Sequence, residues 1–281
     1  MELHVFLAVL ASALCHASWN AGLKMRVDPG VAITIVAIAG GLVAVPLLPI
    51  TGWPARASWP HLTISTLLHV VYFKVLAEAY RAGDLGQVYP IARGSAPLLT
   101  AVGSLLILAE PVAATGAFGI VLLASGVLLL SVRPGTKLAA LEKRAIVFAL
   151  ITAALISTYT LVDGRGARAA GDGHAYAVAF FLYNGAAMGL VGLAQQRREI
   201  RDAMSGGWLI PLGGGLLSFI SYWVALWAMT MAPIAHVAAV RESSVLFASA
   251  IGVIVLKEKL IGARIVAALL VVGGLALIRL S

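Results

Sequence analysis

Ten long apolar stretches dominate this chain of 281 residues. Each is close to the roughly 20 residues that a helix needs to cross the hydrocarbon core of a bilayer. Lipid offers no partners for backbone polar groups, so an open spanning segment must be helical. We therefore predict an all-α integral membrane protein. Its ten transmembrane helices are expected over residues 3–22, 31–50, 62–81, 86–108, 112–132, 144–163, 175–194, 208–231, 235–256 and 262–280.

The composition excludes the soluble classes of protein. The chain is 61% hydrophobic and 11% charged, whereas an ordinary soluble domain is about 25% charged, and its mean hydropathy is +0.98. The formal net charge of +8 comes mainly from connectors between spans, where basic residues orient a membrane protein rather than bind nucleic acid. The single cysteine, Cys15, lies inside the first stretch and predicts neither a disulfide framework nor a metal cluster. We expect no cofactor.

The basic residues of the connectors are divided unequally between the two sides of the membrane. The side that holds both termini has four, namely Arg56, Arg165, Arg168 and Arg279. The other side has thirteen, namely Lys24, Arg26, Arg81, Arg133, Lys137, Lys143, Arg144, Arg197, Arg198, Arg201, Lys257, Lys259 and Arg264. By the positive-inside rule the richer side is cytoplasmic, and both termini face outward.

The two halves of the chain align with each other. The segment Leu108–Glu110 matches Leu256–Glu258 at an offset of 148 residues, and Gly126 matches Gly274 at the same offset. Each half has five spans, an odd number, so the second half enters the membrane from the opposite side. Many secondary transporters are built from such inverted repeats around a midplane site; chance alignment of apolar helices is the alternative. We predict one membrane domain of two repeats, residues 1–137 and 138–281.

Ten spans in two five-helix halves, each with a Leu-x-Glu before its last helix, resemble the EamA-type drug/metabolite transporter superfamily over essentially the whole chain. The motifs are loose, because neither Glu110 nor Glu258 follows the glycine of the family's Gly-Glu. Pro97 matches a family proline, whereas the second half has Leu246 there. The segment His16–Lys24 is also similar to permease-like proteins associated with phosphonate utilisation. The resemblance implies a secondary transporter with cytoplasmic termini, opposite to the charge count, and both orientations stay open.

Charged side chains inside the spans are the leading candidates for a site, because their insertion costs at least about 2.5–3.5 kcal/mol each and they usually face a cavity. Five qualify: Lys74, Glu78, Arg93, Arg241 and Glu242. Lys74 and Glu78 are four residues apart on one helix face. They form a structural pair or, alternatively, Glu78 accepts the proton or ammonium group that is transported.

Arg93 and Glu242 occupy equivalent positions of the two repeats, at an offset of 149 residues. Equivalent helices of an inverted repeat flank one central site, so we expect Arg93, Arg241 and Glu242 to line the same cavity. A structural ion pair between Arg93 and Glu242 is the alternative. In the family, basic residues of the ninth helix bind anionic groups of the substrate, and the resemblance gives this role to Arg241.

Polar and aromatic side chains supply the remaining candidates for substrate binding. His16, Trp19 and Asn20 share one face of the first span, where they line the cavity or, alternatively, serve as packing and membrane-interface residues. The other candidates for the cavity wall are Tyr72, Tyr89, Tyr159, Tyr222 and Trp223.

Two groups of residues are predicted to be structural. Glu110 and Glu258 lie at helix junctions, where an acid stabilises the N-terminus of the following helix. The small-residue segments Gly185–Gly189 and Gly213–Gly215 are expected to allow close helix packing.

The five charged residues inside the spans sum to +1, which favours an anionic or zwitterionic substrate such as an amino acid. We predict a secondary active transporter in a bacterial inner membrane, coupled to protons, to a counter-substrate or to neither. An organophosphonate or organic-acid permease is the alternative within this fold. An intramembrane enzyme and a non-transporting scaffold are the alternatives from other classes. No His-Glu-x-x-His, Gly-x-Ser-x-Gly or nucleotide-binding Gly-x-x-x-x-Gly-Lys motif occurs, so we expect no catalytic residues.

Overall fold

A computed structural model describes residues 1–22, 28–82, 85–130, 143–205, 207–254 and 262–281. Within these ranges all regular secondary structure is helical. The elements are α1 (Leu3–Gly22), α2 (Pro29–Ala44), η1 (Val45–Leu47), α3 (Leu48–Thr51), η2 (Arg56–Ser58), α4 (Trp59–Ala82), α5 (Leu85–Leu108), α6 (Ala114–Leu130), α7 (Lys143–Ala169), α8 (Gly173–Gln195), α9 (Arg197–Met204), α10 (Leu209–Met231), α11 (Ile234–Arg241), α12 (Ser244–Ile254) and α13 (Gly262–Leu280).

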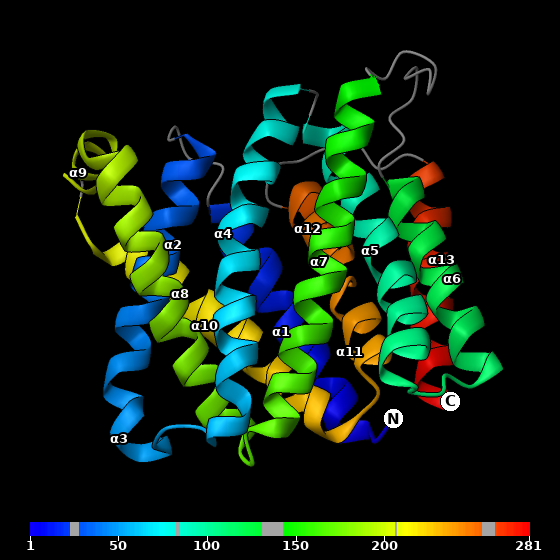
Figure 1. Ribbon diagram of the computed structural model, residues 1–281. Coiled ribbons are helices and arrows are strands. Elements are labelled where there is room, and N and C mark those ends of the chain that lie inside the picture. Colours follow the sequence, from blue (N-terminus) through cyan, green and yellow to red (C-terminus); the bar gives the residue numbers. More distant parts are fainter. Residues whose placement is uncertain (23–27, 83–84, 131–142, 206, 255–261) are drawn as a thin grey trace.

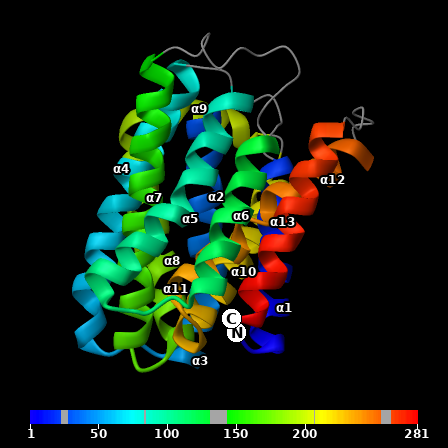
Figure 2. The same cartoon turned by 90° about the vertical axis from the view of Figure 1, so that its right-hand side faces the viewer.

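The long helices stand side by side in one bundle, with the N- and C-termini at the same end (Figures 1 and 2). Among the described residues, eight helices are long and apolar enough to cross a membrane, and α6 is a shorter apolar helix. Large apolar side chains cover the outer surface, including Leu106 at 75% exposed and Leu190 at 71%. An apolar exterior of this extent is typical of contact with lipid rather than with water. The prediction of an all-α membrane protein is therefore confirmed.

Helix starts follow the turn residues of the sequence. Asp28 caps α2, since its carboxylate accepts hydrogen bonds from the backbone N–H groups of Gly30 and Val31, and Pro29 occupies the first turn, where its missing N–H has no cost. Asp172 caps α8 by accepting from the His174 N–H at 2.8 Å. These caps satisfy N–H groups that have no partner inside the helix.

The predicted span boundaries need two corrections that bear on the site. The segment 164–166, which follows the expected span 144–163, is also helical, because α7 continues to Ala169. Its glycines allow close contacts: a Cβ at Gly164 would lie 2.5 Å from Ile234, and one at Gly166 would lie 2.5 Å from the Tyr176 hydroxyl. The expected span 235–256 is two helices, α11 and α12, interrupted between them.

Several helix pairings recur when the two halves of the chain are exchanged. α4 and α5 pack against α7, as α10 and the α11–α12 pair pack against α1. α2 packs against α8, and α6 packs against α13. Each of these last two contacts joins one helix of the first half to the helix that the predicted repeat makes its equivalent in the second half.

Glycines allow the closest of these contacts. A Cβ at Gly126 would lie 2.8 Å from the Ala267 carbonyl oxygen on α13, and one at Gly274 would lie 2.6 Å from the Gly119 carbonyl oxygen on α6. Gly185 meets the backbone of α2 in the same way, with 2.9 Å to the Ala37 oxygen. The two glycines that align between the halves therefore both serve the α6–α13 contact, as small residues do between membrane helices.

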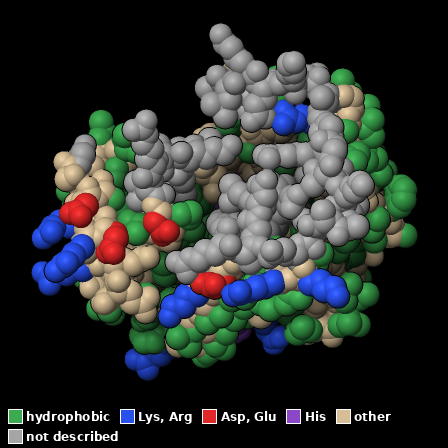
Figure 3. All heavy atoms as spheres, turned by 90° about the horizontal axis from the view of Figure 1, so that it is seen from above, with side chains coloured by type: hydrophobic (Ala, Val, Ile, Leu, Met, Phe, Trp, Pro, Cys, Tyr) green, Lys and Arg blue, Asp and Glu red, His purple; other side chains and the backbone are tan. Residues whose placement is uncertain are grey.

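At the end of the bundle opposite to the termini, the described surface carries Lys and Arg side chains interspersed with Asp and Glu (Figure 3). The short helix α9 lies at this end (Figure 1). It exposes Arg197, Arg198 and Arg201 and buries Ile200 against α2. A short helix with one apolar side chain buried and a charged outer face is suited to the membrane–water interface.

Candidate functional site

A buried ion pair joins the two halves of the chain inside the bundle. The Nε atom of Arg93 on α5 lies 2.8 Å from Oε2 of Glu242, and the two side chains are 7% and 6% exposed. The Nη2 atom of Arg93 also donates a hydrogen bond to the Ser244 hydroxyl at 3.1 Å. Removing two charges from water is costly, so the pair depends on this close geometry and on the added hydrogen bond. The two residues that the sequence alignment of the halves pairs, Arg93 and Glu242, therefore contact each other directly.

Glu242 lies at the interruption between α11 and α12. The N–H groups of Glu242 and Ser243 bond to the carbonyls of Ala239 and Val240, three residues earlier. This tight turn ends α11 inside the protein, where its C-terminal carbonyls carry the negative end of the helix dipole. Arg241 is the basic residue in the last turn of α11. Interrupted helices of this kind form the midplane sites of secondary transporters.

Helix α5 is also disturbed at the same level. Proline has no N–H, so Pro97 cannot donate the usual helix hydrogen bond to the carbonyl of Arg93. Pro97 and Arg93 line a small cavity, with room for about one water molecule, together with residues of α7 and α11. The remaining residues that line it are Ala96, Thr100, Ile156, Tyr159, Thr160, Ala238, Arg241 and Glu242. Backbone irregularities on two helices therefore face each other across one charged cavity.

Arg241 is held differently from Arg93. Its guanidinium group lies over the ring of Tyr222 on α10, 4.9 Å from the ring centroid, a cation–π contact. Its Nε atom is buried and has no hydrogen-bond partner among the described residues. An arginine presents several donors in a rigid fork that fits a carboxylate or a phosphonate. Arg241 therefore has spare capacity to bind an anion at the cavity wall.

Aromatic side chains surround His69 of α4 beside this cavity. The His69 ring centroid lies 4.1 Å from that of Tyr159, 4.9 Å from that of Phe180 and 6.1 Å from that of Tyr222. Tyr72 lies 5.5 Å from Tyr159, centroid to centroid. His69 itself is bound to its own helix, with Nδ1 2.9 Å from the Ser65 carbonyl oxygen. The structure thus brings three predicted tyrosines, Tyr72, Tyr159 and Tyr222, to one place.

A fully buried carboxylate, Asp163, lies next to these tyrosines and was missed by the sequence analysis. Its side chain accepts hydrogen bonds from the Tyr176 hydroxyl at 2.9 Å and the Tyr222 hydroxyl at 2.5 Å, and Ser65 also hydrogen-bonds to it. In the sequence, Asp163 is followed by Gly164 and Gly166, a pattern that is typical of a turn. Its spacing of four residues from Tyr159, which places both on one helix face, was the signal that could have revealed it.

Four ionisable side chains thus meet inside the bundle, and we refer to Arg93, Asp163, Arg241 and Glu242 as the central charged group. Two are cationic and two are anionic when all are ionised. Tyr222 connects them, because its hydroxyl bonds to Asp163 and its ring lies under Arg241.

The first-span candidates form their own contacts on α1. The rings of His16 and Trp19 lie edge to face, 5.3 Å apart, while the Asn20 amide donates to the His16 carbonyl at 2.8 Å. The Trp19 Nε1 atom is buried without a hydrogen-bond partner in the described part of the chain. Trp223 donates through Nε1 to His174 at 2.8 Å and does not line the cavity.

The other acid–base pair expected in a span lies elsewhere. Lys74 is exposed on α4, and Oε2 of Glu78 is 3.9 Å from Nη2 of Arg144, with side chains 39% and 68% exposed. Neither Lys74 nor Glu78 lines the cavity. The side chain of Tyr89 lies outside the described residues, as does Glu258. Within the described ranges, no group of three His, Cys, Asp or Glu side chains could hold a metal ion.

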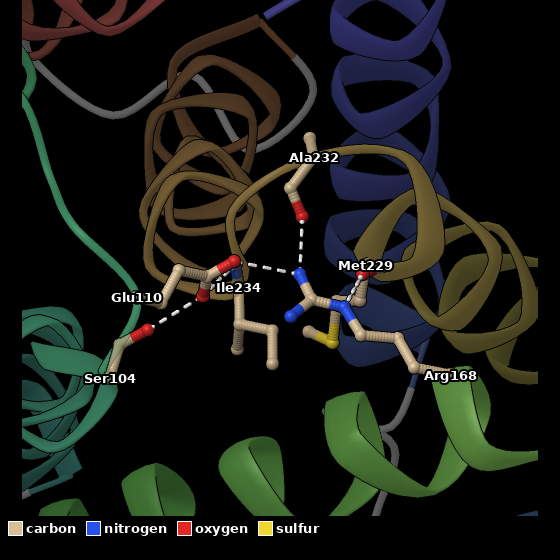
Figure 4. Close-up of polar contacts among 6 residues, drawn as sticks. All are labelled: Ser104, Glu110, Arg168, Met229, Ala232 and Ile234. Atoms are coloured by element: carbon tan, nitrogen blue, oxygen red, sulfur yellow. Dashed lines mark hydrogen bonds and ion pairs between the residues drawn. The ribbon is translucent and has the colours of Figure 1, made fainter. Parts of the chain in front are cut away.

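A second polar network, the terminal network, lies at the end of the bundle that carries the termini (Figure 4). Arg168 of α7 donates to the Glu110 carboxylate at 2.8 Å, to the Met229 carbonyl at 2.8 Å and to the Ala232 carbonyl at 3.0 Å. The Ser104 hydroxyl donates to the same carboxylate at 2.7 Å. This network ties α5, α7 and the α10–α11 junction together.

Glu110 also caps a helix, though not the expected one. Its carboxylate accepts from the Ile234 N–H at 3.0 Å, at the start of α11 rather than of α6. Burial raises the pKa of Glu110, but hydrogen bonds from Arg168, Ser104 and Ile234 outweigh this effect and place the pKa below its ordinary value of 4.5. The carboxylate therefore stays ionised at neutral pH.

Comparison with known proteins relates the second half of the chain to a family. Residues 143–280 match the model of the EamA-like transporter family. One solved structure, titled only as the crystal structure of a protein, is similar in fold, with a TM-score of 0.77 and 18% sequence identity. The alignment covers 98% of this chain and 95% of that one. At this identity the likeness shows the fold alone. No curated protein sequence matches the chain. The chain is a multi-pass, all-helical membrane protein, and its residues 143–280 belong to the EamA-like transporter family.

Proposed function

We propose that the protein is a secondary active transporter of a small anionic or zwitterionic metabolite, such as an amino acid. The observation that carries the proposal is the position of Arg241. This residue lines the cavity at the interruption between α11 and α12, and its buried Nε atom has no hydrogen-bond partner among the described residues. Membrane proteins seldom keep a cation inside a bundle without a use for it. An anionic group bound in the cavity would complete the hydrogen bonding of Arg241.

Alternating access follows from the pairing of the helices. We propose that the two halves, residues 1–137 and 138–281, form an inverted repeat, which the exchange-symmetric packing of α4–α7 and α10–α1 supports. The cavity has room for about one water molecule, so a metabolite enters only when the helices around it separate. Movement of one half against the other would open the cavity to each side in turn.

Carboxylate and phosphonate substrates are both compatible with the arginine fork, so the substrate class must be found by experiment. Purified protein in proteoliposomes would be assayed for uptake of labelled amino acids, small organic acids and aminophosphonates, with protein-free liposomes as the control. We expect protein-dependent flux of at least one anionic or zwitterionic compound. Unlabelled compounds of the same chemical class should inhibit this flux by competition. If no compound in the panel shows protein-dependent flux, the transporter proposal fails in favour of a scaffold.

We further propose that the protein lies in a bacterial inner membrane with its α9 end in the cytoplasm. The support is the basic surface of that end, where α9 exposes Arg197, Arg198 and Arg201, since basic residues favour the cytoplasmic side. A reporter enzyme fused after Ser281 tests the orientation. It should be active only outside the cytoplasm, and activity in the cytoplasm would reverse the assignment.

A further inference from the structure

We propose that Asp163 is the proton-binding residue that couples transport to a proton gradient, and that Tyr222 links it to Arg241. This inference rests on the proposed transport function and adds the coupling ion, its binding residue and the direction of coupling.

The partners of Asp163 allow it to exist in two protonation states. Its side chain is 0% exposed, and it bonds to hydroxyl groups of Ser65, Tyr176 and Tyr222, which come from α4, α8 and α10. Among the described residues, no Lys, Arg or His nitrogen forms an ion pair with it. A hydroxyl group can donate to a carboxylate and can equally accept from a protonated carboxyl group. The carboxyl group of Asp163 can therefore keep a hydrogen-bond partner in either protonation state.

Arg93 and Glu242 lack this freedom. In their direct contact at 2.8 Å the permanent charge of Arg93 faces Glu242, so a proton on Glu242 would leave a buried guanidinium without its counter-charge. Among the two acids of the central charged group, Asp163 is thus the one whose surroundings permit exchange of a proton during transport.

Tyr222 couples the proton site to the substrate site. Its hydroxyl donates to Asp163 and its ring supports the guanidinium of Arg241 at 4.9 Å. Arg241 and Tyr159 both line the cavity, and Tyr159 is one helical turn from Asp163. A shift of Tyr222 that accompanies a change in its hydrogen bond to Asp163 therefore also moves the ring under Arg241, the residue that we expect to bind the anion.

The charges determine the direction of coupling. With Asp163 ionised, the central charged group has two positive and two negative members and a net charge of zero. A proton on Asp163 gives the group a net charge of +1, which an anionic substrate neutralises. Each ligand thus favours binding of the other, since linkage between two sites is reciprocal. The expected mode is symport of an anion with a proton.

Other ionisable groups around Asp163 enter the interpretation of any pH dependence. His69 on α4, Tyr176 on α8, Tyr222 on α10 and Tyr159 on α7 face the same interior. Arg241 on α11 and the Arg93–Glu242 pair lie across the cavity, and His16 lies on α1. His69, whose ring lies beside those of Tyr159 and Tyr222, is an alternative proton acceptor, so a test of Asp163 includes the variant His69→Gln.

A first experiment detects the proton without any substrate. Infrared difference spectra of the full-length protein in lipid nanodiscs, recorded as the pH is stepped, should contain the band of a buried protonated carboxylic acid. We expect the band in the wild type, in Glu78→Gln and in His69→Gln, and its loss in Asp163→Asn. A titrating band that is unchanged in Asp163→Asn would overturn the assignment, whether or not a transported compound has been found.

A second experiment measures coupling in proteoliposomes, with the labelled compound that gives the largest wild-type flux in the panel of amino acids, organic acids and aminophosphonates. Asp163→Asn should retain exchange of labelled for unlabelled compound but lose accumulation driven by an imposed pH gradient, so that its accumulation ratio falls to unity. Glu78→Gln should accumulate the compound like the wild type. Wild-type accumulation in Asp163→Asn would overturn the proposal while leaving the transport function intact.

Tyr222→Phe provides a variant that keeps the ring under Arg241 and removes the hydroxyl bonded to Asp163. The midpoint of the carboxylic-acid titration should shift in this variant. An unchanged midpoint together with unchanged pH dependence of exchange would overturn the link through Tyr222.

Discussion

The central charged group and the terminal network both join the two halves of the chain through an arginine and a glutamate, but they leave their arginines in different states. In the terminal network Arg168 donates to the Glu110 carboxylate and to two backbone carbonyls, and Glu110 also accepts from Ser104 and from the Ile234 N–H. In the central group the Arg93–Glu242 pair stands beside a second arginine, Arg241, whose Nε has no described partner. In the terminal network Nε and Nη2 of Arg168 both have acceptors within the protein, whereas in the central group the buried Nε of Arg241 has none among the described residues and is available to a ligand.

Burial separates the two regions further. The central pair is 7% and 6% exposed, whereas Arg168 is 37% and Glu110 is 15% exposed. The charge of a partly exposed pair is screened by water and contributes little to stability. Loss of one partner from a buried pair instead strands the other charge in a medium of low dielectric constant. The comparison therefore predicts that the loss of unfolding free energy is largest for substitutions in the buried Arg93–Glu242 pair and smallest for substitution of Arg241.

The largest effect on stability is expected for Arg93→Ala, which leaves Glu242 charged and buried. The free energy of unfolding should fall by about 3–5 kcal/mol, the usual cost of breaking a buried ion pair. Unfolding in mixed micelles with increasing denaturing detergent measures this change. A double variant, Arg93→Met with Glu242→Leu, should recover much of the loss. If Arg93→Ala lowers the unfolding free energy no more than a surface substitution does, Arg93 and Glu242 do not form an ion pair in the folded protein.

An intermediate effect is expected for Glu110→Gln in the terminal network. The substitution weakens the hydrogen bonds from Arg168 and Ile234, and bonds to a charged group contribute about 1.5–3 kcal/mol each when buried. Exposure of Arg168 reduces the charge contribution, so we expect a total loss of about 1–2 kcal/mol of unfolding free energy at pH 7.

The pH dependence of Glu110→Gln sharpens this prediction. The pKa of Glu110 in the folded protein lies below its ordinary value of 4.5, so its stabilising contribution is present above that pH and is lost as the pH falls below it. The difference in unfolding free energy between wild type and variant should therefore shrink below pH 4.5. A difference that is constant across this range would mean that the Glu110 charge has no part in the network.

The smallest effect on stability is expected for Arg241→Ala. This arginine has a cation–π contact with Tyr222, worth about 0.5–2 kcal/mol, and no ion pair with Asp163. The free energy of unfolding should therefore fall by less than in Arg93→Ala, although we expect transport to be abolished. A loss of stability as large as that of Arg93→Ala would show that Arg241 is structural and would remove the distinction between the two arginines.

The architecture could be predicted from the sequence because lipid imposes simple rules on length and hydropathy. The interruption at Glu242 could not, since no proline or glycine marks it and the contact with Arg93 is a tertiary one. Asp163 was missed because Gly164 and Gly166, which follow it, are typical of a turn. In the structure these glycines lie in a helix and allow close contacts with Ile234 and Tyr176. Alignment of the two halves did place Arg93 opposite Glu242, which the structure shows in contact.

The aromatic surroundings of the site depended on packing that the sequence does not specify. Tyr159 and Tyr222 meet at His69 through helices from both halves of the chain. Lys74 and Glu78 were candidates for the site because both lie in a predicted span. In the structure Lys74 is exposed and Glu78 is partly exposed on α4. Hydropathy identifies a charge inside a span, whereas the rotation of each helix decides whether that charge faces the interior.

The most direct test of the account is counterflow in proteoliposomes, with equal amounts of wild type, Arg241→Ala and Arg165→Ala. Arg165 is an exposed arginine of α7 and serves as the matched control. For the labelled compound that the wild type carries best, Arg165→Ala should exchange at the wild-type rate and Arg241→Ala should show no exchange above protein-free liposomes. Exchange by Arg241→Ala at the wild-type rate would contradict the central claim that the anion binds at Arg241.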